Sequence, residues 1–338
     1  MYEIILQNLL SPVVLFFLLG LIAALVKSDL KFPKALSETL SIFLLVAIGL
    51  KGGIELSKYS FQEVISPVIA TLFLGSLLPI VALLLLKTIK LDTKNAIGLA
   101  ATYGSVSIVT YGAAISFLDH VGTSFEGFMN AMVVLMESPA IIISLILLKV
   151  LDSKENRSET YIPQRLAFSS PATSFLDKDV LKEAFFGKSI ILLLGALLIG
   201  LVAGDNAIPV IQPLFIDLYS SVLILFLLSM GITAGERLPE VKKHGPKLLL
   251  FGIVMPIVGG TLGVLVGSMI GLSIGGMTLM GVLAGSASYI AAPAALRTSV
   301  PEANPSIYLG LALGITFPFN LIFGIPLFYQ FASWLGTL

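Results

Sequence analysis

The chain has 338 residues, of which 57% are hydrophobic and 12% are charged, and its formal net charge is zero. A soluble domain carries about 25% charged residues, so this composition is typical of a membrane protein. The balanced charge gives no strong attraction to nucleic acid, and the absence of cysteine excludes disulfides, thiolate metal sites and thiol nucleophiles.

The apolar residues gather in runs of about 20 residues, long enough to cross about 30 Å of hydrocarbon. Such runs also exclude an outer-membrane barrel, whose strands alternate over about ten residues. The sequence therefore predicts an all-α polytopic membrane protein with ten transmembrane helices. In chain order, the expected spans are 10–27, 36–56, 65–87, 96–117, 127–150, 187–204, 213–234, 247–270, 276–297 and 306–335.

The basic residues predict the orientation of these spans, because Lys and Arg are retained on the cytoplasmic side. With the N-terminus outside, every Lys and Arg except Lys51 and Lys58 falls on the inner side. The acidic loop with Asp119, His120 and Glu126 is then external. We expect a multi-pass protein of the bacterial inner (plasma) membrane with both termini outside.

Three short similarities recur in the same order in the two halves of the chain. They pair 47–53 with 229–235, 99–107 with 283–288, and Pro139 with Pro318. A repeat of about five spans forces the second copy to insert upside down, as in many secondary transporters. The sequence thus predicts two inverted five-helix repeats, at 1–151 and 185–338.

A polar segment, 152–184, separates the two predicted repeats. It contains Ser, Thr, Pro and mixed charge but few large apolar residues. A solvated cytoplasmic linker is the simpler interpretation, and a docking site for a regulatory protein is the alternative.

The fourth and ninth spans contain the most polar and glycine-rich stretches, 103–112 and 285–289. Glycines loosen a helix, and Pro293 removes a backbone donor, so both spans are expected to break near the midplane. Freed N–H groups at helix starts suit an anion, whereas freed carbonyls and hydroxyls suit sodium. Close helix packing through small residues is the alternative. The candidate substrate-binding residues are Gly104, Ser105, Val106, Ser107, Gly285, Ser286, Ala287 and Ser288.

Glu137 is the acidic residue that falls well inside a predicted span. A carboxylate at membrane depth indicates a functional site, where it could bind sodium or carry a proton, unless it faces a wet vestibule or an ion-pair partner. Asn130, Thr316 and Asn320 are more typical of interhelical hydrogen bonds. The candidate sodium ligands are Ser105, Thr110, Glu137, Ser138, Ser286, Ser288 and Thr316.

The sequence gives no indication of an enzyme. His120 and His244 fall in loops on opposite sides of the membrane, and no carboxylate pair, nucleophile elbow or phosphate-binding loop is present. No catalytic residue and no cofactor are predicted; sodium is expected as a coupling ion.

Distinctive motifs occur at 104–107, 136–140 and 273–276 and, most specifically, at 286–295, and they continue through 296–297, 301–306 and 324–328. Together they resemble the sodium-dependent bicarbonate transporters of cyanobacteria. It implies a homotrimeric sodium symporter, with helices three to five and eight to ten as a mobile core and the others as a scaffold. It also implies that the broken fourth and ninth helices cross and hold bicarbonate and sodium, and that a small cytoplasmic regulator of the PII type binds.

The chain departs from this family in two places. Its linker is shorter, and Ile108 and Tyr111 stand where small and aromatic residues are usual. The leading hypothesis is sodium-coupled symport of bicarbonate or a similar small anion by an elevator-type motion. The alternatives are a cation–proton antiporter that titrates Glu137 and a membrane ion sensor that signals through the linker.

Overall fold

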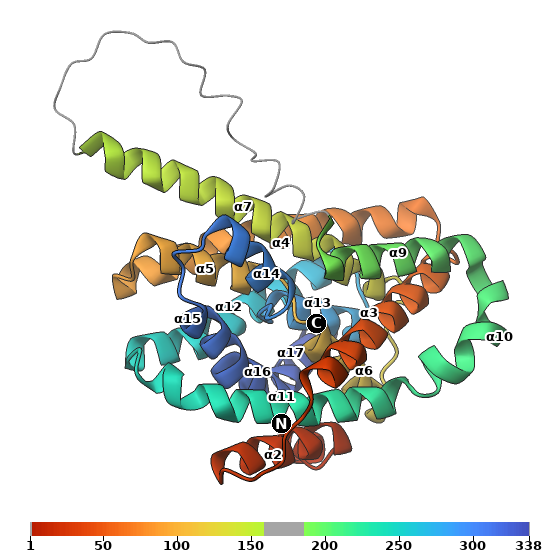
Figure 1. The fold of residues 1–338 in the computed structure, drawn as a ribbon. Coiled ribbons are helices and arrows are strands. Elements are labelled where there is room, and N and C mark those ends of the chain that lie inside the picture. The colour runs from red at the N-terminus through yellow and green to blue at the C-terminus, as the bar shows by residue number, and fades with distance from the viewer. Residues whose placement is uncertain (1, 159–185, 338) are drawn as a thin grey trace.

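The computed structural model describes residues 2–158 and 186–337, and the regular elements in these ranges are helical (Figure 1). The elements before the undescribed segment are α1 (Tyr2–Leu9), α2 (Pro12–Leu25), α3 (Lys34–Leu56), α4 (Phe61–Ile89), α5 (Thr93–Gly104), α6 (Ile108–His120) and α7 (Met129–Ser158). The predicted all-α class is confirmed for the described residues. The predicted linker lies outside them, apart from 152–158, which continue α7.

The second part of the chain contains shorter elements. They are α9 (Lys188–Ala203), η1 (Gly204–Ala207), α10 (Ile208–Ile211), η2 (Gln212–Ile216), α11 (Tyr219–Lys242), α12 (Pro246–Met269), α13 (Ile274–Ala284), α14 (Ala291–Ser299), α15 (Pro305–Leu311), η3 (Ala312–Thr316), α16 (Phe317–Phe319), η4 (Asn320–Gly324) and α17 (Ile325–Leu335). The elements η2, η3 and η4 are π-helical, with i to i+5 hydrogen bonds, whereas η1 is a 3-10 turn.

Seven helical stretches of the described residues are long and apolar enough to cross a membrane, or eight if the bent pair α1 and α2 forms one span. The chain is thus a multi-pass membrane protein, but fewer helices than the predicted ten are long and apolar enough to be counted as separate spans. One reason is that Lys188–Val241 is continuous over 54 residues. At 1.5 Å per residue this exceeds twice the bilayer core, and it covers two predicted spans. The other reason is that α13, with 11 residues, is short by itself.

Glycines allow α2 and α11 to pack at backbone distance (Figure 1). A Cβ atom at Gly20 would overlap the carbonyl oxygen of Leu228 in α11. A Cβ atom at Gly231 would overlap the carbonyl oxygen of Phe17 in α2. Small residues at such contacts gain dispersion contacts between helices where lipid offers no hydrophobic driving force.

The same pattern recurs between α3 and α9. A Cβ atom at Gly200 would overlap the carbonyl oxygen of Leu50, and one at Gly53 would overlap that of Leu197. Each pair thus joins a helix from the first part of the chain to one from the second. Glycines of both similar stretches, 47–53 and 229–235, take part in these contacts. We call α2, α3, α9 and α11 the scaffold.

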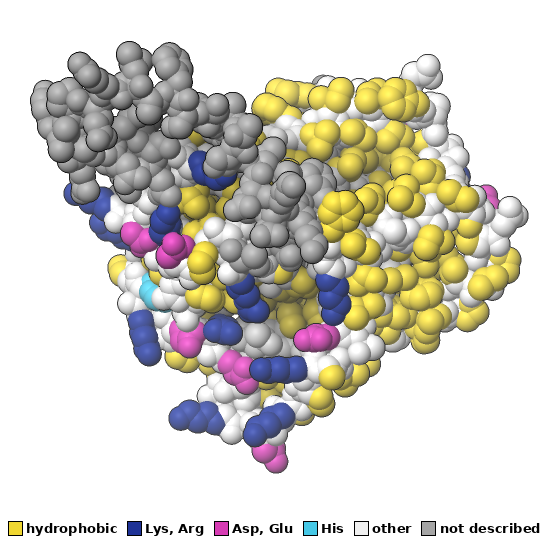
Figure 2. All heavy atoms as spheres, turned by 45° about the horizontal axis from the view of Figure 1, so that its top comes forward, with side chains coloured by type: hydrophobic (Ala, Val, Ile, Leu, Met, Phe, Trp, Pro, Cys, Tyr) yellow, Lys and Arg dark blue, Asp and Glu magenta, His cyan; other side chains and the backbone are white. Residues whose placement is uncertain are grey.

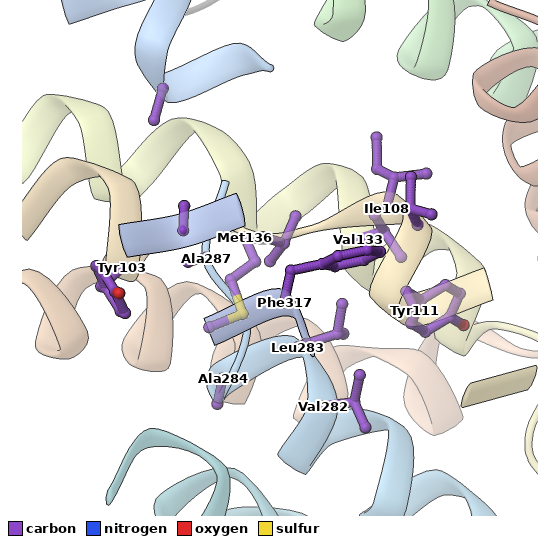
Figure 3. Packing of buried hydrophobic residues seen from close by; sticks show 14 of the residues in the cluster. Tyr103, Ile108, Tyr111, Val133, Met136, Val282, Leu283, Ala284, Ala287 and Phe317 are labelled. Atoms are coloured by element: carbon purple, nitrogen blue, oxygen red, sulfur yellow. The ribbon is translucent and has the colours of Figure 1, made fainter. Parts of the chain in front are cut away.

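Apart from α1 and α10, the remaining helices form a second group, which we call the core: α4 to α7 and α12 to α17. In the core α4 packs against α5 and α7, and α13 packs against α12 and α17. Figure 3 shows part of the buried interior, to which Met136 of α7, Leu283 of α13 and Phe317 of α16 contribute side chains. The last span, Pro305–Leu335, belongs to this group and agrees with the predicted range 306–335.

The surface agrees with a membrane environment. Figure 2 shows Lys and Arg side chains gathered at one end of the molecule, beside a broad surface of hydrophobic side chains. Large apolar side chains are exposed on the scaffold helices, among them Leu19 and Ile22 of α2 and Ile199 and Val202 of α9. Such a surface is favourable where lipid or another subunit covers it.

We predict that Gly231→Ala lowers the free energy of unfolding by about 1–3 kcal/mol, because the added methyl group forces α2 and α11 apart. The matched control is Gly195→Ala on α9, where a Cβ atom would meet no atom within 4 Å. Thermal unfolding of the purified protein in detergent compares the two variants. Equal stability would contradict the close approach of α2 and α11.

Candidate functional site

The fourth predicted span is interrupted, as expected. Helix α5 ends at Gly104 and α6 begins at Ile108, so 105–107 are not helical. Ser107 caps α6: its Oγ accepts hydrogen bonds from the Thr110 backbone N–H at 3.2 Å and from the Thr110 hydroxyl at 2.8 Å. Serine is a preferred residue at this position because its side chain satisfies a free N–H of the first turn.

The ninth predicted span is interrupted at the corresponding place. Helix α13 ends at Ala284 and α14 begins at Ala291. The Ser288 Oγ accepts a hydrogen bond from the Ala292 N–H at 3.2 Å. Pro293 lies in the first turn of α14, where its missing N–H leaves no intrahelical bond unmade. It therefore fits the start of a helix, and the non-helical residues precede it.

The two interruptions contact each other directly. The Ser288 backbone N–H donates to the Thr102 carbonyl oxygen at 2.8 Å, and the Ser107 backbone N–H donates to the Ser286 Oγ at 2.9 Å. The Ser286 hydroxyl in turn donates to the Leu283 carbonyl oxygen at 3.0 Å. One backbone N–H of each break is thus satisfied by an acceptor from the other side of the contact. We call this contact region, 102–107 and 285–289, the crossover.

The crossover contains hydroxyl donors at two helix N-termini. The Ser107 and Ser288 side chains are 3% and 1% exposed, and each accepts from the first turn of the helix that follows it. Neither hydroxyl donates a hydrogen bond with good geometry to another described residue. Because the N-terminus of a helix carries a partial positive charge, the two serines can direct their protons to an anion.

The same region contains buried oxygen atoms without a donor. Among the described residues, the Thr102 Oγ1, Ser105 Oγ, Glu137 Oε2 and Asn320 Oδ1 atoms are buried and have no hydrogen-bond partner. Ser105 is the counterpart of Ser286, whose hydroxyl bridges the two breaks. Buried polar atoms are usually paired, so these oxygens point to a ligand that is itself positive or a donor.

Glu137 lies on α7 and is 1% exposed. Helix α7 packs against α5, and a Cβ atom at Gly104 would lie 3.0 Å from the Cβ of Ala140. Since residues three apart share a face of a helix, Glu137 lies on the side of α7 that faces the end of α5. No ion pair between this carboxylate and a Lys or Arg occurs among the described residues.

Other predicted sodium ligands already make hydrogen bonds. The Thr110 hydroxyl donates to Ser107, and the Thr316 hydroxyl donates to the Gly252 carbonyl oxygen at 2.6 Å and pairs with the Tyr103 hydroxyl at 2.6 Å. Ser138 is half-buried beside Glu137. The hydrogen bonds of Thr110 and Thr316 hold the surrounding helices in place, so these residues contribute to the structure of the site more than to ion binding.

Two residues complete the site beyond the candidate ligands named from the sequence. Asn320, in the last span, donates from Nδ2 to the Gly285 carbonyl oxygen at 2.8 Å and so holds the end of α13. Thr102 lies one turn before Ser105, and the three-residue spacing alone could have indicated a shared face. The candidates Gly104, Val106, Gly285 and Ala287 lie in the crossover, and Gly104 packs on Pro79 of α4.

A cavity of about 320 Å³ lies between the scaffold and the second break. Its walls include Ser41 of α3, Met230 of α11 and Tyr289 of the break. Glu38 and Lys188, near the starts of α3 and α9, also line it, on the predicted cytoplasmic side.

A second cavity of about 390 Å³ lies on the predicted outer side, between α1 and α2 and the end of α6. Asp119 and His120 line it, and so does Asn8. The Asn8 Nδ2 donates to the Leu321 carbonyl oxygen at 2.6 Å, which links α1 to the π-helical element η4 of the core. The two cavities thus approach the scaffold–core interface from opposite ends.

An all-helical, multi-pass membrane protein with two interrupted helices and unpaired polar groups at their contact has the features of an ion transporter. Residues 12–333 match the family model of the Na+-dependent bicarbonate transporter superfamily, and the chain belongs to this family. The family confirms the resemblance noted in the sequence. Its description indicates a sodium-dependent bicarbonate transporter and implies that the chain is not an enzyme. No curated protein matches the chain.

We predict that Ser286→Ala lowers the free energy of unfolding by about 1–3 kcal/mol, because the Ser107 N–H is then buried without an acceptor. Thermal unfolding in detergent measures the effect. The matched control is Ser76→Ala on α4, where an exposed hydroxyl donates to the Leu72 carbonyl oxygen. If Ser286→Ala were as stable as this control, the bridge between the breaks would contribute nothing.

Proposed function

We propose that this protein is a secondary active transporter that couples sodium to the symport of bicarbonate or a similar small anion. The observation that carries the proposal is the chemistry of the crossover. Two helix N-termini with serine hydroxyls face a region that also contains unpaired oxygens and a buried carboxylate. Donors and positive helix ends suit an anion, and the oxygens suit sodium.

The anion would bind to backbone N–H groups and hydroxyls of 104–107 and 285–288. Sodium would bind nearby, to Ser105 and Glu137, with support from the other predicted ligands. We add Thr102 and Asn320 to this set, because each has a buried oxygen without a partner. Each ion then neutralises the other, which explains how one small site could hold both.

The transport cycle would be an elevator-type alternating-access motion of the core against the scaffold. The matched glycine contacts of α2 with α11 and of α3 with α9 support two inverted five-helix repeats, 1–151 and 185–338. Such repeats permit two mirror-related conformations. The cavities on the two sides of the scaffold–core interface are the expected routes of access.

The number of spans, the oligomeric state and the orientation in the membrane are part of the same proposal. We propose ten spans, a homotrimer, and insertion in the bacterial inner membrane with both termini outside. The predicted partner is a PII-type cytoplasmic regulator that would contact the linker 152–184. The positive-inside distribution of Lys and Arg supports the orientation.

The test is uptake of labelled bicarbonate into proteoliposomes with and without an inward sodium gradient. We expect sodium-dependent uptake. We also expect the Ser107→Ala, Ser288→Ala double variant to lose it, because the serine hydroxyls beside the two helix N-termini are removed. Uptake by the double variant at the wild-type rate would contradict the proposed location. Absence of uptake by folded, sodium-binding protein would indicate a different small anion.

Glu137 also suits a cation–proton antiporter, because a buried carboxylate without an ion-pair partner can carry a proton. Under the symport proposal, Glu137→Gln raises the sodium concentration for half-maximal uptake about tenfold, the effect of about 1.4 kcal/mol of lost attraction. Uptake stays independent of a proton gradient. Sodium titrations of uptake at two pH values measure both effects.

The matched control is Glu302→Gln, which changes an exposed carboxylate outside the crossover. We expect it to leave the sodium dependence unchanged. Sodium flux that is driven by a proton gradient in wild type and lost in Glu137→Gln would favour the antiporter over the symporter.

A further inference from the structure

Tyr289 occupies a distinctive place at the edge of the crossover. It follows Ser288 directly and is half-buried, whereas Ser286 and Ser288 are each 1% exposed. Its ring packs edge to face against Phe317 of α16, with ring centroids 5.7 Å apart. The ring is thus fixed between the buried serines and the cavity of about 320 Å³.

The hydroxyl of Tyr289 has no good hydrogen-bond partner. It is buried and approaches the Ser107 side chain, but it lies outside hydrogen-bonding geometry with the described residues. The Ser107 Oγ already accepts two bonds from Thr110. A buried phenol usually has a partner, so this hydroxyl is available to a ligand at the start of α6.

The other break has no such group. The residue that follows its capping serine is Ile108, which is 7% exposed and apolar. The two half-helix starts therefore differ in one donor. This donor belongs to the break that borders the cavity on the predicted cytoplasmic side.

We propose that Tyr289 is the cytoplasmic gate of the crossover and a specificity-determining residue for its anion. Its ring closes the cavity off from Ser107 and Ser288, and its hydroxyl donates a hydrogen bond to an oxygen of the bound oxyanion. The donor role rests on the proposed function, whereas the closing role rests on geometry alone. An oxyanion with several acceptor oxygens can engage this donor and the serine hydroxyls together, which a spherical halide does less well.

The donor role is tested with Tyr289→Phe, which keeps the ring and removes the hydroxyl. We expect the KM for bicarbonate in sodium-driven uptake to rise about tenfold, as for a lost hydrogen bond to a charged group, with little change in the sodium dependence. The matched control is Tyr329→Phe, whose hydroxyl pairs with Thr123 on the predicted outer side. An unchanged KM in Tyr289→Phe would overturn the donor role.

The closing role is tested by cysteine labelling, since the chain contains no cysteine of its own. Ala287→Cys places a thiol in the crossover, at a position 3% exposed. In inside-out vesicles, a charged methanethiosulfonate should label this thiol at least tenfold faster when Tyr289→Ala is added, and no faster with Tyr289→Phe.

Equal labelling rates with and without Tyr289→Ala would overturn the closing role. This measurement needs no transport. If wild type failed to take up bicarbonate, the proposed function would fail in the uptake assay, while the labelling rates would still decide whether Tyr289 closes the crossover.

Discussion

The constraint on which this fold depends is that hydrocarbon offers no hydrogen bonds to an open backbone. A helix can break at membrane depth only if other protein groups take over the bonds that the break releases. Here each break does this for the other: Thr102 accepts from Ser288, and Ser286 accepts from Ser107. The two interruptions therefore stabilise each other.

The scaffold and the core differ in the residues that line their helix contacts. Scaffold pairs approach at backbone distance through Gly20, Gly53, Gly200 and Gly231, which leaves few side-chain rotamers to rearrange. The core instead encloses polar atoms, and several of these have no partner. The scaffold is thus tightly packed, whereas the crossover contains unsatisfied polar groups. An ion that binds there provides a partner for a buried, unpaired atom, so we expect ions to act on the structure mainly through the crossover.

The sequence identified the breaks because glycine, serine and proline stand out in an apolar span. It identified Glu137 for the same reason, since a carboxylate is rare at this depth. It did not reveal that Ser107 pairs with Ser286, because the two are separated by 179 positions and neither local sequence indicates a distant partner. Only the three-residue spacing to Ser105 marks Thr102, whose carbonyl oxygen accepts from Ser288 and whose hydroxyl has no partner among the described residues. Likewise, the sequence alone did not show which helix each scaffold glycine contacts, because that depends on long-range packing.

The hydrogen bond from Asn8 to Leu321 bears on how evenly two conformations could be populated. It links α1 to the core, so a displacement of the core relative to α1 would break it. Asn8 also lines the outer cavity, where its freed amide would meet water. Exchanging a protein acceptor for water changes the free energy by only about 0.5–1.5 kcal/mol. The link thus biases the resting conformation by a small factor, about twofold to tenfold, and leaves the opposite conformation within thermal reach.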